Sequence, residues 1–303
     1  MQTDRDAEIV YWIGSLGAAG AEHVMRQFEM SRSMAYQRLN SLTRDGLLEH
    51  HAVLYGRSGM YCATSAGLRW RNLGRLGVCR VRPGGFEHAW QVAQAAVELQ
   101  ACLPDWDVMS DRRIRWFEAE NNRPFASAEV GRSGERPALH RPDLALVSPE
   151  DGLVVSIEVE LSVKSAARLA TICRGWARAR HLYGVYYLAA PEPGRAVRRA
   201  VNAAHATDSI NVLNLDQVYV LAAEVRESFE TGEVRIDEAA FARLGTPSPP
   251  YRELQIMADM RTQEGRSRLA SAIESALRHE GSSECFGDRV MQPNCSPSKS
   301  RWI

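Results

Sequence analysis

The chain has 303 residues, of which 45% are hydrophobic and 24% are charged. This apolar content excludes a chain that is disordered throughout, and the length suits two domains that each bury a core. Basic and acidic residues balance at 37 each, so net charge alone favours no class of partner.

The six cysteines are scattered, and no two of them have the CxxC spacing of a zinc site. We therefore expect neither a zinc site nor a disulfide framework, and we expect a reducing compartment. Residues 1–20 have no basic leader before an apolar run, and no run reaches the roughly 18 apolar residues that a membrane span requires. These features predict a cytoplasmic protein that does not enter a membrane.

Residues 1–82 have the pattern of a winged helix-turn-helix domain. Apolar residues at helical spacing, serine caps and glycine stops predict helices at 4–16 and 21–28, and a third from Ser31 or Ser33 to residue 45. Two expected strands, 47–54 and 60–63, flank a turn rich in glycine and serine. Three helices followed by a hairpin make a winged helix, and a further helix is expected after Thr64.

The third helix of this domain is the candidate for DNA recognition, because one of its faces is apolar and the other is polar. Between Glu22 and Arg82 the chain has ten arginines and four acidic residues, an excess that suits a phosphate backbone. A helix with a merely solvated polar face, or a winged helix that binds only protein, is the alternative. The residues expected to approach phosphates or base edges are Arg32, Ser33, Tyr36, Gln37, Asn40, Arg44 and Arg57.

The pattern of residues 83–245 predicts a second domain of the α/β/α type, after a linker at 80–85. Strands that alternate with helices in its second half indicate a largely parallel sheet. A polar stretch at 120–137 is expected to be a mobile loop. The expected elements are helices at 86–103, 165–181 and 194–205, and strands at 108–117, 144–147, 153–161, 184–190 and 210–215. A hairpin around residues 231–232 and a short helix are expected within 224–244, and residues 246–303 are expected to form a helical extension, at 251–279, with a disordered tail.

Two strands and several charged residues meet in the segment 141–165, RPDLALVSPEDGLVVSIEVELSVKS. Alternation along the second strand puts Glu158 and Glu160 on one face, and Asp143 can lie beside them at the start of the neighbouring strand. Three carboxylates at strand ends repel one another unless a divalent cation, a basic neighbour or a raised pKa relieves the repulsion. Lys164, one of only two lysines in the chain, is the nearest basic residue.

This arrangement, Pro142 and Asp143 followed by Glu158, Glu160 and Lys164, resembles the PD-(D/E)xK nuclease core. More narrowly, RPD followed by EVELSVKS after a winged helix resembles the replication-relaxation family of actinobacterial plasmids and mobile elements. The resemblance covers roughly residues 1–220 in layout. It implies a mixed α/β fold, double-stranded DNA as the partner, and a role in plasmid or mobile-element replication or transfer, with homodimerisation left open.

The resemblance also implies metal-dependent DNA cleavage with Mg²⁺ or Mn²⁺. Asp143 and Glu158 would bind the metal, Glu160 would assist, and Lys164 would orient or polarise the phosphate. The family pattern has lysine two residues after the acid, and this chain has Glu160 there. Either Lys164 supplies the ammonium group from the first turn of the next helix, or the core is inactive and the chain is a non-catalytic DNA-binding or regulatory factor.

The helix expected at 86–103 carries His88 and Glu98. PD-(D/E)xK proteins often place an extra acid on this helix that points at the metal, and Glu98 is the candidate for that role. A surface position or a satisfied position in the core is the alternative for both residues, because an isolated histidine or glutamate on a helix carries little information.

Overall fold

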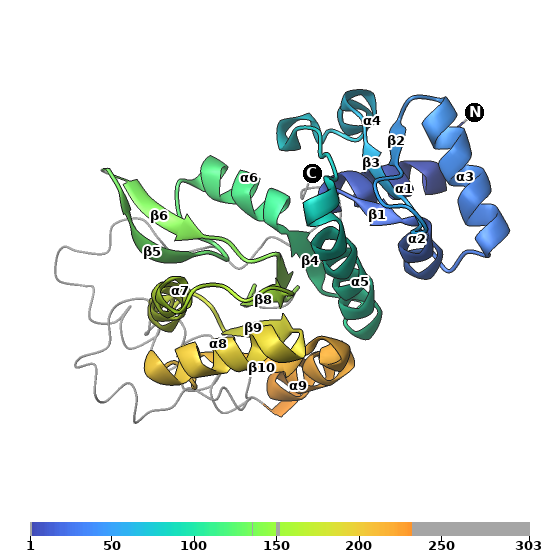
Figure 1. Ribbon diagram of the computed structural model, residues 1–303. Helices are drawn as coiled ribbons and strands as arrows, with labels where there is room; N and C mark the ends of the chain where they lie inside the picture. The colour runs from blue at the N-terminus through green and yellow to red at the C-terminus, as the bar shows by residue number, and fades with distance from the viewer. Residues whose placement is uncertain (1, 135, 150–151, 232–303) are drawn as a thin grey trace, which may run out of the picture. The chain divides into compact units, whose positions relative to one another are not determined.

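A computed structural model describes residues 2–134, 136–149 and 152–231 (Figure 1). They form a mixed α/β structure, which confirms the predicted fold class at that level. The described residues up to Glu227 belong to one compact unit. The expected helix at 251–279, the tail after it and the boundary at 245 lie outside the described residues, and the boundary at 82 stays a prediction.

Three helices come first in the chain, and their ends lie within one residue of the predicted ends. They are α1 (Asp4–Leu16), α2 (Ala21–Gln27) and α3 (Arg32–Arg44). Thr3 and Asp6 form a capping box at the start of α1. The Ser31 hydroxyl accepts a hydrogen bond from the Met34 amide at the start of α3. These caps satisfy amides that have no partner within the helix, so the local sequence fixes where each helix begins.

The same part of the chain forms an antiparallel sheet with the strand order β1-β3-β2. It consists of β1 (Ala19–Gly20), β2 (Leu48–His51) and β3 (Met60–Ala63), and α4 (Ser65–Trp70) comes after it. β2 ends at His51 rather than at residue 54, and β1 was not predicted because two residues show no periodicity. Helices and sheet share an apolar core that includes Ile9, Ile13, Leu39, Leu42, Leu48 and Leu68.

Two short 3-10 turns, η1 (Gly74–Leu76) and η2 (Pro83–Gly85), lead to α5 (Phe86–Cys102). The strand expected at 108–117 is wrong over most of its length. β4 (Asp107–Ser110) is followed directly by α6 (Asp111–Asn121). Ser110 is the N-cap of α6, since its hydroxyl accepts from the Arg113 amide, and this cap turns the chain from strand to helix.

The prediction of a loop at 120–137 is also wrong, because much of this stretch belongs to an antiparallel hairpin. The hairpin consists of β5 (Ala128–Ser133) and β6 (Arg136–His140). The pairing shifts register between Glu129 and Gly131, as in a β-bulge. That irregularity interrupts the alternation of apolar and polar residues and leaves the sequence looking like a loop.

The larger sheet has five strands in the order β10-β9-β8-β7-β4. β8, β9 and β10 are parallel, as predicted, whereas β7 is antiparallel to both β8 and β4. The elements after β6 are β7 (Leu144–Val147), β8 (Val154–Glu160), α7 (Ala166–Arg178), β9 (Gly184–Ala189), α8 (Pro191–Ala203), β10 (Ile210–Asn214), η3 (Leu215–Gln217) and α9 (Val218–Thr231). Within the described ranges, no helix combines the length and the apolar character that a membrane crossing needs.

β8 is buried along its whole length. Val154 packs in a core with Leu169 and Trp176 of α7, and the Ser156 hydroxyl donates to the Ala126 carbonyl oxygen at 2.8 Å. Since side chains alternate along a strand, Glu158 and Glu160 face the same side as these two residues. Both carboxylates therefore lie on the side of the sheet that α7 covers.

Candidate functional site

Asp143 and the acidic end of β8 are neighbours because of the strand register. Leu144 in β7 pairs with Ile157 in the antiparallel strand β8, so the residue before Leu144 lies next to Glu158. The Asp143 carboxylate accepts a hydrogen bond from the Val159 amide at 2.8 Å. The carboxylates predicted to gather at these strand ends are thus brought together, and their chemical roles stay predictions.

Glu158 is only 4% exposed and contacts a histidine that the sequence did not single out. Its Oε1 lies 2.7 Å from Nε2 of His140, at the end of β6, although the contact lacks the alignment of a hydrogen bond. The His140 ring packs edge-on against Trp176, at 5.5 Å between ring centroids. Burial raises the pKa of Glu158, while the neighbouring His140 opposes that rise. Glu158 is therefore held in a largely enclosed position.

Asp143 has a histidine partner of its own, His88 of α5. The two side chains lie 3.3 Å apart, between Nε2 and Oδ2. The hydrogen bond with Asp143 raises the pKa of His88, against the effect of burial. His88 is exposed, in line with the surface position that was one of its two alternatives, and it also contacts a carboxylate of the predicted site.

Lys164 reaches the acidic cluster, formed by Asp143, Glu158 and Glu160, but not from the first turn of a helix as predicted. It lies just before α7, whose N-cap is Ser165, in the connection from β8. Its ammonium group forms an ion pair with the buried carboxylate of Glu160. Its charge also acts on Glu158, whose pKa it lowers. Lys164 thus neutralises part of the negative charge at this end of the sheet.

Glu98 is engaged elsewhere. It pairs with Arg26 of α2 and accepts a hydrogen bond from the Tyr219 hydroxyl of α9. Gln94, one turn earlier in α5, also donates to it. In the part of the chain that the structure describes, these groups are its polar partners, so it does not supply the extra acid expected near Asp143.

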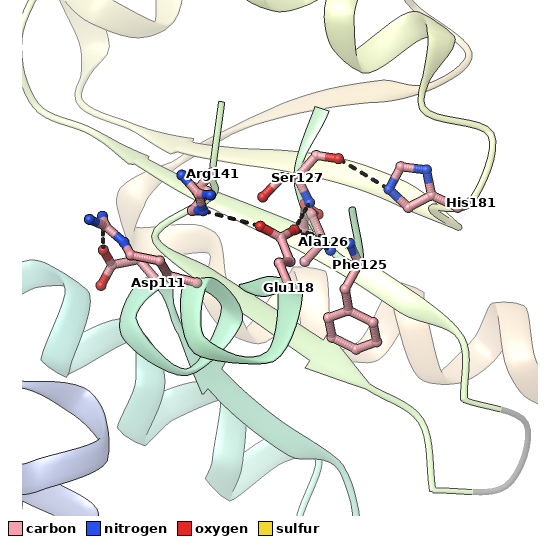
Figure 2. A network of polar contacts seen from close by, with 9 residues as sticks. Asp111, Glu118, Phe125, Ala126, Ser127, Arg141 and His181 are labelled. Carbon is pink, nitrogen blue, oxygen red and sulfur yellow. Dashed lines mark hydrogen bonds and ion pairs between the residues drawn. The ribbon is translucent and has the colours of Figure 1, made fainter. Parts of the chain in front are cut away.

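Another buried carboxylate, Glu118 of α6, positions the chain around Asp143 without belonging to the predicted set. Figure 2 shows Glu118 between Arg141 and the loop at 125–127. Its Oε1 accepts from the three backbone amides of that loop at 3.0, 3.3 and 3.1 Å, and Oε2 accepts from Nε of Arg141 at 3.1 Å. A carboxylate with four donors is satisfied, so Glu118 fixes the loop and the approach to Asp143.

Figure 2 also shows Asp111, whose carboxylate accepts from Arg115 at 3.4 Å, and His181. The Asp111 amide donates to the Asp143 carbonyl oxygen at 2.9 Å. Burial raises the pKa of the Asp111 carboxyl, and the charge of Asp143 adds to the rise. Nε2 of His181 lies 3.1 Å from the carbonyl oxygen of Ser127. The first contact holds the backbone at Asp143, and the second holds the loop at 125–127.

The predicted metal ligands are Asp143 and Glu158. Among the described residues, no three or more histidine, cysteine or acidic side chains are gathered as a cation site. Asp143 and Glu158 are hard oxygen donors of the kind that Mg²⁺ and Mn²⁺ prefer, and Mg²⁺ commonly binds through one or two carboxylates, with waters and a substrate phosphate as its other ligands. Two carboxylates alone do not complete such a site, so metal binding stays a prediction.

An open groove of about 470 Å³ lies beside this cluster, between the β5–β6 hairpin and α7. The groove is lined by Val130, Leu139, His140, Ala167, Arg168, Thr171 and Ile172. His140 belongs both to the groove and to the contact with Glu158. Arg168 is exposed, so it adds a cation that a phosphate entering the groove would meet.

α3 presents most of the residues predicted to contact DNA. Its inner face is buried through Ala35, Leu39 and Leu42. Its exposed side chains are Arg32, Ser33, Met34, Gln37, Asn40 and Arg44. Tyr36 is half-buried beneath the Arg32 guanidinium, which lies 5.7 Å from the ring centroid. The outer face therefore combines basic and amide groups.

Arg57 lies at the exposed turn between β2 and β3, but it has protein partners. Its guanidinium pairs with Glu87 at 3.1 Å and lies over the rings of Phe86 and Trp90. Both members of the ion pair are about half exposed, so the pair is weak and a phosphate can compete for Arg57.

Comparison of the chain with protein-family models, with curated proteins and with solved structures gives no match. The resemblance to the replication-relaxation family therefore stays a prediction, and function has to be inferred from the described side chains.

Proposed function

We propose that the chain binds double-stranded DNA through the outer face of α3, presented by a winged helix-turn-helix made of α1 to α4 and the β2–β3 hairpin. The observation that carries this proposal is the composition of that face. α3 contains three arginines and no acidic residue. Its one inward arginine, Arg38, is neutralised by Asp6 at 2.8 Å, which leaves the outer face with the basic character that a phosphate backbone requires.

The spacing of the polar side chains suits a helix in the major groove. Ser33, Gln37, Asn40 and Arg44 follow one another at helical intervals and share one face. They form no hydrogen bond or ion pair with the described residues, so within that part of the chain no such contact has to break when DNA binds. Glutamine and asparagine can read adenine edges, while arginine can bind phosphate or guanine.

Fluorescence anisotropy with a labelled duplex over a range of NaCl concentrations tests this proposal. The affinity should fall steeply with salt, and Arg44→Ala should reduce the magnitude of the log–log slope by about 1 if Arg44 contacts one phosphate. Arg199→Ala, which removes an exposed arginine from α8, is the matched control and should leave the slope unchanged. Undetectable or salt-independent binding would contradict the proposal.

A second candidate function is metal-dependent cleavage of the DNA backbone at the acidic cluster, in a PD-(D/E)xK-like core. The convergence of Asp143, Glu158 and Lys164 at the ends of β7 and β8 supports it. Asp143 and Glu158 would hold Mg²⁺ or Mn²⁺, which would supply a Lewis acid and an activated water. Lys164 would balance charge that develops on the phosphate. By resemblance, the chain would act in plasmid or mobile-element replication or transfer.

The alternative is an inert core, in which the same residues only hold the sheet together. Incubation of supercoiled plasmid with Mn²⁺ separates the two, with Asp143→Ala and Glu158→Gln as test variants and Asp216→Asn, an exposed acid, as control. Cleavage by the wild type and the control but not by the test variants supports a nuclease. DNA binding without cleavage in any variant supports the non-catalytic factor, and calorimetric titration of Mn²⁺ into the same samples reports whether the ion binds.

A further inference from the structure

Two cysteines from different parts of the chain lie in one apolar cluster. Cys62 is buried in β3, and Cys79 is partly exposed in the coil between η1 and η2. Both pack with Met60, Val81 and Phe86. Their side chains hydrogen-bond to each other, and both are free thiols. Two thiols in contact are the starting point for a disulfide.

A cation lies beside the more accessible sulfur. Arg112 of α6 donates to the carbonyl oxygens of Leu76, at 3.1 Å, and Gly77. A Cβ atom added to Gly17 would meet Nη1 of Arg112 at 3.3 Å and Sγ of Cys79 at 3.4 Å, so both groups border the same small space. The guanidinium is held in place by the two carbonyl groups and faces the sulfur.

The hydrogen bond from Cys62 lowers the pKa of Cys79 to about 6, and the charge of Arg112 contributes to this effect against burial. The same hydrogen bond raises the pKa of the Cys62 thiol. Of the two sulfurs, the accessible one therefore ionises more readily. Cys173 is the contrast within this chain, because its burial raises its pKa to about 11.

We propose that Cys79 and Cys62 are a redox-active dithiol that reacts with low-molecular-weight disulfides and closes to a reversible disulfide. The Cys79 thiolate attacks one sulfur of the small disulfide RSSR, which forms a mixed disulfide and releases RS⁻. The Cys62 thiol then loses its proton and attacks the Cys79 sulfur, and a second RS⁻ leaves. In total, two protein thiols are oxidised and one RSSR is reduced to two RSH. This inference is independent of the proposed function.

The bond would close a loop from β3 to the segment before α5, with α4 inside it. Closing a loop of this length restricts the unfolded chain, so oxidation should raise the melting temperature by several degrees. The rise should disappear when dithiothreitol restores the two thiols.

Peptide mapping of the full chain after treatment with oxidised glutathione tests the proposal directly. After acid quenching, alkylation and trypsin digestion, peptide 58–69 should be linked to peptide 76–80. Cys79→Ser should abolish the link and leave Cys62 alkylated, whereas Cys62→Ser should stop at a glutathione adduct on Cys79. Cys102→Ser, which removes another partly buried thiol, should keep the link. Recovery of both cysteines as free thiols from folded wild-type protein would overturn the proposal, as would a glutathione adduct on Cys79 that Cys62 does not resolve.

The pH dependence of the reaction distinguishes an activated thiolate from a passive contact. In the wild type, the rate of glutathione adduct formation should rise with pH around a midpoint near the Cys79 pKa of about 6. Arg112→Gln should shift that midpoint upward and slow the reaction at pH 7. A midpoint near that of an ordinary thiol in the wild type would contradict the activation of Cys79, and an unchanged midpoint in the variant would contradict the part assigned to Arg112.

Discussion

Glu118 is a buried carboxylate that is held by several polar partners. It is 3% exposed and accepts hydrogen bonds from three amides and one guanidinium. Removing the charge from such a site leaves donors without a full partner, which costs more than the same change at the surface.

Glu118→Gln should therefore lower the free energy of unfolding by about 2–4 kcal/mol, since an amide cannot accept from the loop amides and Arg141 with both of its heavy atoms. Urea denaturation followed by circular dichroism measures the change. Glu120→Gln, at a solvent-exposed position on the same helix, should change stability by less than about 0.5 kcal/mol. Equal losses in the two variants would contradict the role given to Glu118.

Asp6 predicts a pH dependence of stability. Burial raises the pKa of its carboxyl, but hydrogen bonds from Thr3 and Arg38 outweigh this and leave the pKa below its ordinary value. A carboxyl with a lowered pKa in the folded state stabilises the fold above its ordinary pKa of 3.8, and this contribution is lost as pH falls through the folded pKa.

Asp6→Asn should thus be less stable than the wild type by about 1 kcal/mol at pH 7. The difference should shrink below about pH 4, because the wild type then protonates the same group. Denaturation curves of both proteins from pH 3 to pH 7 give the comparison. A difference that stays constant over this range would show that the charge of Asp6 contributes nothing.

The sequence predicted which acids meet but not what holds them. Asp143, Glu158 and Glu160 were placed together by strand periodicity, and Lys164 by its nearness in sequence. His88 lies on α5, far from the segment 141–165 in sequence, whereas His140 directly precedes that segment at the end of β6. Neither was singled out as a partner of the acids, because an isolated histidine carries no periodic signal. Their contacts depend on how α5 and the β5–β6 hairpin pack on the sheet.

At the scale of elements, caps and turns made the first helices predictable, since Thr3 and Ser31 mark their starts in the local sequence. The prediction was wrong at α6 and at the β5–β6 hairpin. α6 begins in the middle of an expected strand because Ser110 caps it. The hairpin has a bulge and is supported by packing on α7, which local sequence does not reveal.

The packing of α7 on β5 depends on Gly175. A Cβ atom at this position would lie 2.9 Å from Cγ1 of Val130 and 3.0 Å from the carbonyl oxygen of Glu129. Gly175→Ala should therefore destabilise the fold by about 1–3 kcal/mol through overpacking, although alanine favours a helix over glycine by about 1 kcal/mol.

Gly194→Ala in α8 is the matched control, because its Cβ would meet Ala189 at an ordinary 3.4 Å. This variant should be neutral or more stable by up to about 1 kcal/mol. Thermal and urea denaturation of both variants measure the difference. A stabilising Gly175→Ala would mean that the helix and the hairpin are further apart than described.

At the scale of the whole molecule, the balanced net charge conceals an uneven distribution. Residues 22–82 hold ten arginines, two of which α3 exposes, while buried acids gather at the ends of β7 and β8. Glu98 links helices from the beginning, middle and end of the described chain through Arg26 of α2 and Tyr219 of α9. This division suits a protein that binds an anionic polymer with one region and carries an acidic cluster in another.

The most direct test of DNA binding by α3 is a charge change on its outer face. The double variant Gln37→Glu and Asn40→Glu adds two negative charges at exposed positions that have no internal partner among the described residues, so the fold should be retained. Anisotropy with a labelled duplex at fixed salt should show at least a tenfold loss of affinity, because like charges would face the phosphates. Wild-type affinity in a variant with an unchanged circular dichroism spectrum would contradict the assignment of α3 as the DNA-binding helix.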